Sequence, residues 1–369
     1  MVNFFKEVAA LFTQPPQARK ASKAAGPHKS QEQIEQGRSG DRYSSMLIED
    51  IIMESPTVNL GNGRAQKVVE TTGAKSQEEQ VKTLCRQFLV TFLAYNNQGE
   101  GVNKLIAALP EEGRATILAQ PGTVASLVEN GQGDSTVKLI AGLSSPKGQA
   151  SALSTGYAVS TLANHGYAEP VMKFLAAMTP EQQANVLFKE GAVESLCAKG
   201  QAKPLMDMIS AMPVENQMTV FSGRKAVLSL ANAGQAEAVM KCLDAMSAKD
   251  RLGVYHENDA AAGLAANGQA KQIMAHIEAY SKEDQGYILI AANAVVALAA
   301  NGQAQSVMNV IDKLDDYNTQ GQILAAPGAV ESLKENGQPG AAALINHVAS
   351  LQEIDRPRMR APFGMPGYS

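Results

Sequence analysis

The chain contains no tryptophan and few other aromatic residues, which together make up 5 % of its 369 residues. A large β-sandwich is therefore disfavoured, because strands prefer aromatic and β-branched residues. Hydrophobic residues still account for 45 % of the chain, enough for a substantial core. Since Ala, Gly, Gln, Asn and Met fill the remaining space, the composition favours short helices that pack closely in series.

Cysteines are also scarce, and their spacing excludes a disulfide framework. Cys85, Cys197 and Cys242 lie far apart, and none forms a CxxC pair or has a nearby His. No stretch reaches eighteen apolar residues, so we predict no transmembrane segment. Residues 1–12 lack both a basic start and a long apolar run, which is unlike a standard secretory signal. These absences predict a chain that resides in the reducing cytoplasm.

Positive charge is scarce in the body of the chain. Residues 1–46 hold seven Lys/Arg and four acids, and the tail from Gln352 holds three and two. Because the whole chain carries −4, the body between them carries −8. Binding along a phosphate backbone needs a basic face, so an acidic body argues against nucleic acid as the partner.

What the sequence does have is a repeat. The phrase Asn-Gly-Gln-Ala, or a close variant, returns every 34 or 35 residues. We number each unit from its marker residue, and these markers are Gly63, Asn97, Gly131, Gly166, Gly200, Gly234, Gly268, Gly302 and Gly337. A register held over this length indicates a repeat architecture of about eight full units.

Each unit carries the same pattern of helix signals. Apolar residues at positions six, seven, ten and thirteen predict a first helix of about twelve residues. A capping signal such as Thr179-Pro180 then predicts a second helix. A mid-unit break follows in some units, as at Glu190-Gly191, so the pattern leaves two or three helices per unit open. The marker ends the last helix, and Asn or Gly there predicts a left-handed conformation.

No unit can bury its apolar face alone, so neighbouring units must stack. We therefore predict an all-α fold, an α-solenoid (superhelical array) of about eight 34-residue helical repeats with capping helices at 46–62 and 341–351. Its handedness stays open. Residues 1–45 are predicted to be a mostly disordered basic segment, 46–351 the repeat domain, and 352–369 a flexible Arg/Pro/Gly tail. We expect a monomeric array.

The sequence shows no catalytic or metal-binding constellation. It has no HExxH, GxSxG or Walker motif and no Cys/His set with metal spacing. His165 replaces the Asn before a marker, so we interpret it as a structural residue. His276 occupies a slot that Phe174 and Cys242 fill elsewhere, so we interpret it as a packing residue and not as a ligand. We predict no enzyme activity, no cofactor and no metal. The methionines at position seven are predicted to lie in the core between units; the alternative is a promiscuous binding surface.

Glutamine recurs at position two, directly after the marker. Stacking would align these residues in a row, as either a ladder that bonds loop backbone between units or a polar strip that binds an extended chain. The candidate partner-binding residues are Gln132, Gln201, Gln235, Gln269 and Gln303.

Residues 46–351 resemble short-helix α-solenoids in general. Residues 295–304 are similar to the helix–loop–helix of DNA-reading TAL-effector-type repeats, although no Gly-Gly-Lys-Gln loop follows and the segment order differs. Arg356, Arg358 and Arg360 resemble the cationic export signals of some bacterial secreted effectors, which would send the protein to a host cell. We predict a scaffold or adaptor for a protein partner. The alternatives are a nucleic-acid-binding repeat protein that reads through its loops, and an enzyme with a site between repeats.

Overall fold

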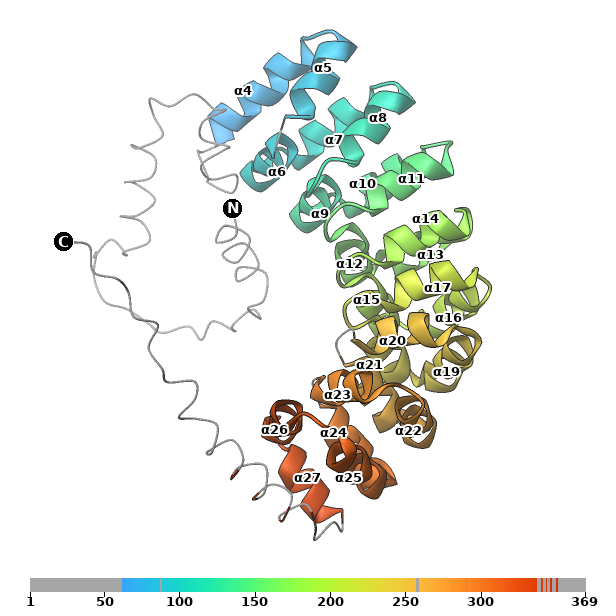
Figure 1. The fold of residues 1–369 in the computed structure, drawn as a ribbon. Helices are drawn as coiled ribbons and strands as arrows, with labels where there is room; N and C mark the ends of the chain where they lie inside the picture. The colour runs from blue at the N-terminus through green and yellow to red at the C-terminus, as the bar shows by residue number, and fades with distance from the viewer. Residues whose placement is uncertain are drawn as a thin grey trace, which may run out of the picture. The chain divides into compact units, whose positions relative to one another are not determined.

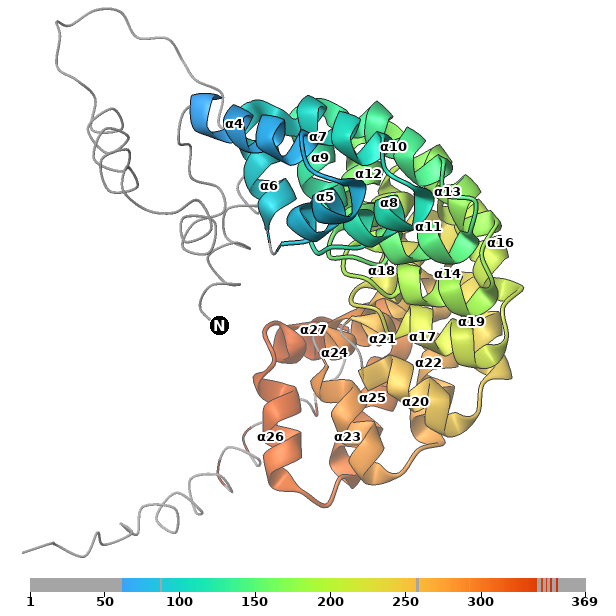
Figure 2. The same ribbon diagram turned by 90° about the horizontal axis from the view of Figure 1, so that it is seen from above.

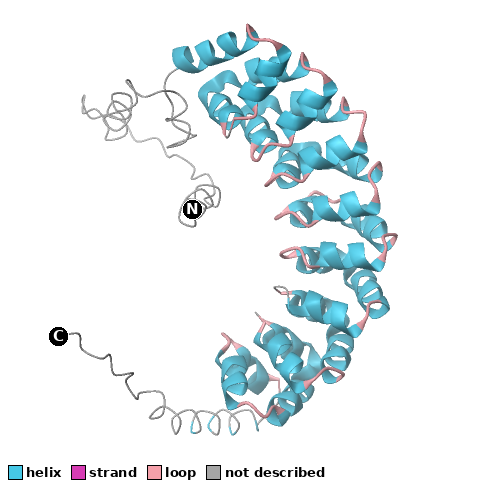
Figure 3. Cartoon of the chain, turned by 45° about the horizontal axis from the view of Figure 1, so that its top comes forward, coloured by secondary structure: helices cyan, strands magenta, loops and turns pink. Residues whose placement is uncertain are grey.

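The computed structural model describes residues 62–336 except Gln87, Glu257, Asn258 and Ala292, together with residues 340, 343, 346 and 350. Every regular element in this part is helical, which confirms the all-α class (Figure 3). Chain contacts separate residues 1–47 from 48–369. The predicted N-terminal segment, the first capping helix up to Gly61, the Gly337 marker and the Arg-rich tail lie outside the described residues, as does most of 341–351.

Each described unit contains three helices. The first helices are α4 (Asn62–Gly73), α7 (Gly99–Ala107), α10 (Gly133–Ala141), α13 (Ala168–Ala176), α16 (Ala202–Ser210), α19 (Ala236–Ala245), α22 (Ala270–Glu278) and α25 (Ala304–Lys313). The second helices are α5 (Gln77–Leu84), α8 (Glu111–Leu118), α11 (Pro146–Leu153), α14 (Pro180–Leu187), α17 (Val214–Phe221), α20 (Ala248–His256), α23 (Lys282–Ile290) and α26 (Tyr317–Ala325). The third helices are α6 (Leu89–Leu93), α9 (Thr123–Leu127), α12 (Ala158–Leu162), α15 (Ala192–Ala198), α18 (Ala226–Leu230), α21 (Ala260–Leu264), α24 (Ala294–Leu298) and α27 (Ala329–Glu335).

The mid-unit break is present in every described unit, and it separates the second helix from the third. One residue there has a positive φ in each unit: Phe88, Gly122, Gly156, Gly191, Lys225, Asp259, Asn293 and Gly328. Half of these residues are not glycine, so the break is not visible in the sequence of those units. The left-handed residue separates the second helix from the third, so each described unit has three helices.

The marker residues adopt the left-handed conformation that the sequence predicts. Asn97 has φ 61°, and the marker glycines from Gly131 to Gly302 have φ between 78° and 95°. In six units the third helix continues to the marker through a π-helical segment, such as η5 (Ala265–Gln269). The expectation is wrong for Gly63, which lies in the first turn of α4, where no described helix precedes it to be ended. The first helices after α4 are also shorter than predicted, with nine or ten residues.

Equivalent helices of neighbouring units pack against each other. Helix α14 lies between α11 and α17 (Figure 1). Helix α18 likewise contacts α15 and α21. From above, α8, α11 and α14 also follow one another side by side (Figure 2). Leu175, Leu205 and Ile209 of the first helices are fully buried, and burial of such a side chain stabilises the fold by about 1.5–3 kcal/mol. The core therefore runs through the interfaces between units as well as within them.

The methionines at position seven belong to this core. Met206, Met240, Met274 and Met308 are buried, and Met172 is half-buried. This confirms the prediction that the row lies mainly inside the fold. No single helix in the described residues is long and apolar enough to cross a membrane.

Candidate functional site

A row of buried or half-buried glutamines at about position eighteen joins the first and second helices of a unit. Gln183 donates from Nε2 to the carbonyl oxygens of Leu175 (2.9 Å) and Met178 (3.3 Å), where α13 ends. The other members make bonds of the same kind: Gln80, Gln149, Gln217, Gln285 and Gln320. These bonds satisfy carbonyls that a helix leaves unpaired at its C-terminus. Arg114 and Arg251 replace Gln in two units.

The Asn before the marker has a structural role as well. Its Nδ2 donates to the carbonyl four residues earlier, for example from Asn301 to Ala297 (2.8 Å) and from Asn130 to Ser126 (2.8 Å). His165 replaces this Asn, and its Nδ1 lies 2.9 Å from the carbonyl oxygen of Thr161. His165 therefore caps the helix end, in agreement with the structural interpretation of this residue.

The position-two glutamines sit where each first helix begins, and all five candidates are half-exposed. Gln132 is engaged, because its Oε1 accepts a long hydrogen bond from Asn103 Nδ2 (3.5 Å) and its side chain lies against Gly99 of the preceding unit. Within the described part of the chain, the other four candidates make no side-chain hydrogen bond: Gln201, Gln235, Gln269 and Gln303.

The row is interrupted at Tyr167, which takes position two in its unit. Its ring covers Gly133, and its hydroxyl donates to Asp134 Oδ1 (3.0 Å) of the preceding unit. Four free amides in consecutive units thus lie on one side of this interruption. Because they bond no loop backbone in the described residues, the ladder between units is not formed there, and the binding strip stays a prediction.

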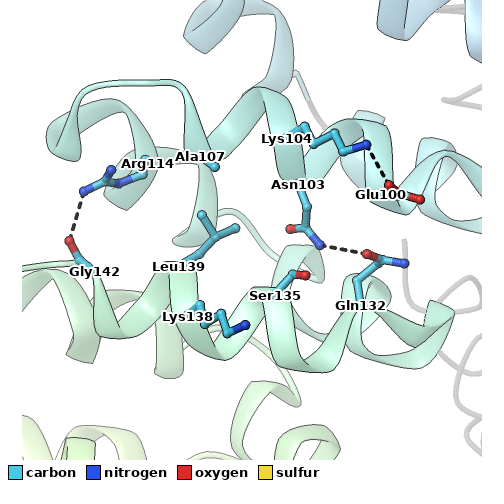
Figure 4. A pocket seen from close by; sticks show the side chains of 10 residues that line it. All are labelled: Glu100, Asn103, Lys104, Ala107, Arg114, Gln132, Ser135, Lys138, Leu139 and Gly142. Carbon is cyan, nitrogen blue, oxygen red and sulfur yellow. Dashed lines mark hydrogen bonds and ion pairs between the residues drawn. The ribbon is translucent and has the colours of Figure 1, made fainter.

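A groove opens between α7 and α10, the first helices of two consecutive units, and has a volume of about 560 Å³. Asn103 points from α7 toward α10, and Lys138 and Ser135 line the opposite wall (Figure 4). Arg114 of α8 closes one end, where a guanidinium nitrogen donates to the carbonyl oxygen of Gly142 at 2.9 Å. The candidate Gln132 lies at the other end.

The excess of positive charge in this groove favours an anionic ligand. The lining contains three cations, Lys104, Arg114 and Lys138, and one acid, Glu100. Glu100 Oε1 lies 2.7 Å from Lys104 Nζ. The hydrogen bond from Lys104 lowers the pKa of Glu100. Asn103 is 5 % exposed, and its Oδ1 has no hydrogen-bond partner within the described residues. Arg114 Nε is likewise buried without a partner there.

A second polar cluster surrounds His276, at the interface of α19, α20 and α22. Its Nε2 lies 2.9 Å from Asp244 Oδ1, and its Nδ1 lies 2.7 Å from the hydroxyl of Tyr255. Burial lowers the pKa of His276, and the neighbouring Arg251 lowers it further, against the opposing effect of Asp244. The interpretation of His276 as a packing residue is thus incomplete, because its partners are polar. Tyr255 is fully buried, whereas the Asp244 side chain is exposed.

Cys85, Cys197 and Cys242 are free thiols, and each is at least partly buried. Burial raises the pKa of Cys197 to about 11 and also raises the pKa values of Cys85 and Cys242. Thiols with raised pKa values are weak nucleophiles at neutral pH. Among the described residues, no group of three His, Cys, Asp or Glu side chains is arranged to hold a metal ion.

Comparison with known proteins adds no family to this description. No protein-family model matches the chain, and no curated protein matches it.

Proposed function

We propose that this chain is a non-enzymatic scaffold or adaptor, built as an α-solenoid, that binds a protein or peptide partner along its repeat surface. The stacking of equivalent helices in neighbouring units supports this architecture. A stack of repeats that contact mainly their neighbours offers the same surface position again in each unit. Such a surface suits an extended ligand, which presents its own backbone groups at regular intervals.

The observation that carries the proposal is the set of four free glutamine amides at position two. Gln201, Gln235, Gln269 and Gln303 are half-exposed, have no hydrogen-bond partner among the described residues, and occupy equivalent places in consecutive units. A glutamine amide both donates and accepts hydrogen bonds. A peptide backbone also offers both kinds of group, so each glutamine matches one peptide unit of a bound chain.

The spacing of packed helices fits such a ligand. Helices in contact lie about 8–10 Å apart, and three residues of polyproline II helix advance by roughly 9.3 Å. One glutamine therefore meets every third residue of an extended peptide. The chain carries a net charge of −4, which opposes the many phosphate contacts that a nucleic-acid strand would need.

A display selection tests this proposal directly. Random peptides of about twelve residues are selected against the full chain, and the peptides recovered are titrated against a variant in which all four glutamines are alanine. We expect the affinity to fall by at least about tenfold, since each lost hydrogen bond contributes about 0.5–1.5 kcal/mol. The glutamines make no capping hydrogen bond, so the variant should fold normally.

The matched control changes the exposed residues at position four of the same units, namely Lys203, Glu237, Lys271 and Gln305, to alanine. This control should bind as the wild type does. Equal affinity of the wild type and the glutamine variant would show that the row is not the binding surface. Selection of no peptide, together with tight binding of single-stranded DNA, would favour the nucleic-acid alternative instead.

A further inference from the structure

Two residues in the groove between α7 and α10 depart from the repeat pattern, and they meet at the same place. Position seven is methionine in the five units that begin at Gly166 to Gly302, but Asn103 takes it in the unit of Asn97. Position eighteen is usually the glutamine that caps the C-terminus of the first helix in its own unit, but in this unit it is Arg114. Arg114 instead bonds Gly142, at the end of the next unit's first helix. The groove thus differs chemically from the other interfaces between first helices.

The buried side chain of Asn103 lowers the stability of the folded protein when no ligand is bound. Its side chain is 95 % buried, and its single hydrogen bond, to Gln132, leaves Oδ1 unpaired within the described residues. An unpaired polar atom in the interior destabilises the fold, because it loses its hydrogen bonds to water. A ligand N–H that donates to Asn103 Oδ1 would remove this cost. The residue lines the groove, and its side chain points across it toward α10 (Figure 4).

The cations specify the second feature of the ligand. Glu100 is paired with Lys104, whereas Lys138 makes no ion pair within the described part of the chain. Arg114 keeps a buried Nε–H without a partner there. Lys138 and Arg114 thus offer two positively charged donors to a carboxylate in the groove. Hydrogen bonds between charged groups are stronger than those between neutral groups.

We infer that this groove binds an acidic segment of the partner peptide, with a Glu or Asp carboxylate near Arg114 and Lys138 and a backbone N–H donated to Asn103. This inference rests on the proposed function and names the chemistry of its ligand. A peptide supplies both an anion and a neighbouring N–H donor, whereas the phosphodiester backbone of DNA offers only acceptors. The groove volume of about 560 Å³ lies within the range of peptide and small-molecule pockets.

Fluorescence anisotropy with the full chain tests the inference. The probe is a labelled peptide of repeated Glu-Ala-Pro triplets, about twelve residues long and capped at both ends, which favours an extended conformation. Three further probes separate the possible sources of the anion: the same peptide with Gln in place of Glu, that Gln peptide with a free C-terminal carboxylate, and an oligothymidine of similar length.

The variants use residues that the fold already accepts. Arg114→Gln and Asn103→Met restore the residues of other units, and Lys138→Gln changes an exposed residue, so at least one variant keeps its fold. Lys173→Gln is the matched control, because Lys173 is the exposed position-eight residue of the next unit. Circular dichroism melts confirm that each variant used for titration is folded.

We expect saturable binding of the Glu peptide, weakened by about tenfold or more in each groove variant and unchanged in Lys173→Gln. If all three groove variants still bind the Glu peptide as the wild type does, the inference is overturned, although the chain would remain a peptide-binding protein. A preference for the Gln peptide with a free C-terminus would assign the groove to a terminal carboxylate and overturn it too. Tighter binding of oligothymidine than of any peptide would overturn both this inference and the proposed function.

Discussion

The hydroxyl of Tyr255 lies 2.7 Å from Nδ1 of His276, although the two residues belong to consecutive units. Asp244 Oδ1 accepts from Nε2 on the other side of the ring. Nε2 therefore carries the proton, and the Nδ1 lone pair accepts from Tyr255. This arrangement fits a neutral imidazole, and it lets Tyr255 satisfy its hydroxyl inside the core.

Stability should depend on pH through His276. Burial and Arg251 lower the pKa of His276 below its ordinary value of 6.5, so the unfolded chain binds more protons than the folded chain between these two pKa values. The free energy of unfolding therefore falls as the pH falls below about 6.5, and this contribution is fully present at higher pH. Urea unfolding at pH 7.5 and pH 5.5 measures the difference.

A His276→Gln variant should show a smaller loss of stability between these two pH values than the wild type. His256→Gln serves as the control, because His256 is exposed and contacts the ring of Tyr287. It should keep the wild-type difference. The assignment is wrong if removal of His276 leaves the pH dependence unchanged.

A change at a marker glycine should destabilise the fold through its backbone conformation alone. Gly268 has φ +87°, and an added Cβ would meet no atom within 4 Å. Gly268→Val should cost about 1–3 kcal/mol, because a β-branched residue is strained there. Gly268→Asn should cost less than about 1 kcal/mol, since Asn97 holds the same place with φ 61°. Thermal melts of both variants give the comparison.

Gly253→Val is the matched control for this experiment. Gly253 lies in α20, has equally open surroundings and does not have a positive φ. Valine there should be neutral or slightly stabilising. An equal loss of stability at both positions would mean that the left-handed stop is not what Gly268 provides.

The buried glutamine row should contribute measurably to stability. Gln183→Leu removes the hydrogen bonds to the carbonyls of Leu175 and Met178, and we expect a loss of about 1–3 kcal/mol in urea unfolding. Gln201→Leu is the same substitution at a half-exposed side chain without a hydrogen bond, and it should stay within about 0.5 kcal/mol of the wild type. The capping role is refuted if the two variants are equally stable.

The sequence predicts those features that depend on local conformation. Gly268 and Asn97 are visible as helix stops because only a few residue types favour a left-handed backbone. The break at Lys225 is hidden for the same reason, since lysine does not signal a positive φ. The breaks at Gly122, Gly191 and Gly328 are visible. Because only some units show such a signal, the sequence leaves the number of helices per unit open.

The groove between α7 and α10 could not be predicted from the sequence in this way. Asn103 and Arg114 each depart from a repeat position, and an alignment of the units could have shown both departures. Their meeting in one groove depends on how α8 reaches the end of the next unit's first helix, which the periodicity does not specify. The sequence also cannot show that the Gln201 side chain has no hydrogen-bond partner among the described residues, because the repeat pattern would equally allow it to bond the next loop.

Hydrogen–deuterium exchange of the full chain, with and without a peptide recovered in the display selection, tests the central claim most directly. Backbone N–H groups in the first turn of a helix have no partner within the helix, so a peptide bound at the glutamine row should slow exchange there. We expect slower exchange in all four of the ranges 200–205, 234–239, 268–273 and 302–307. Protection confined to one unit, or to the mid-unit breaks on the other side of each third helix, would contradict binding along the row.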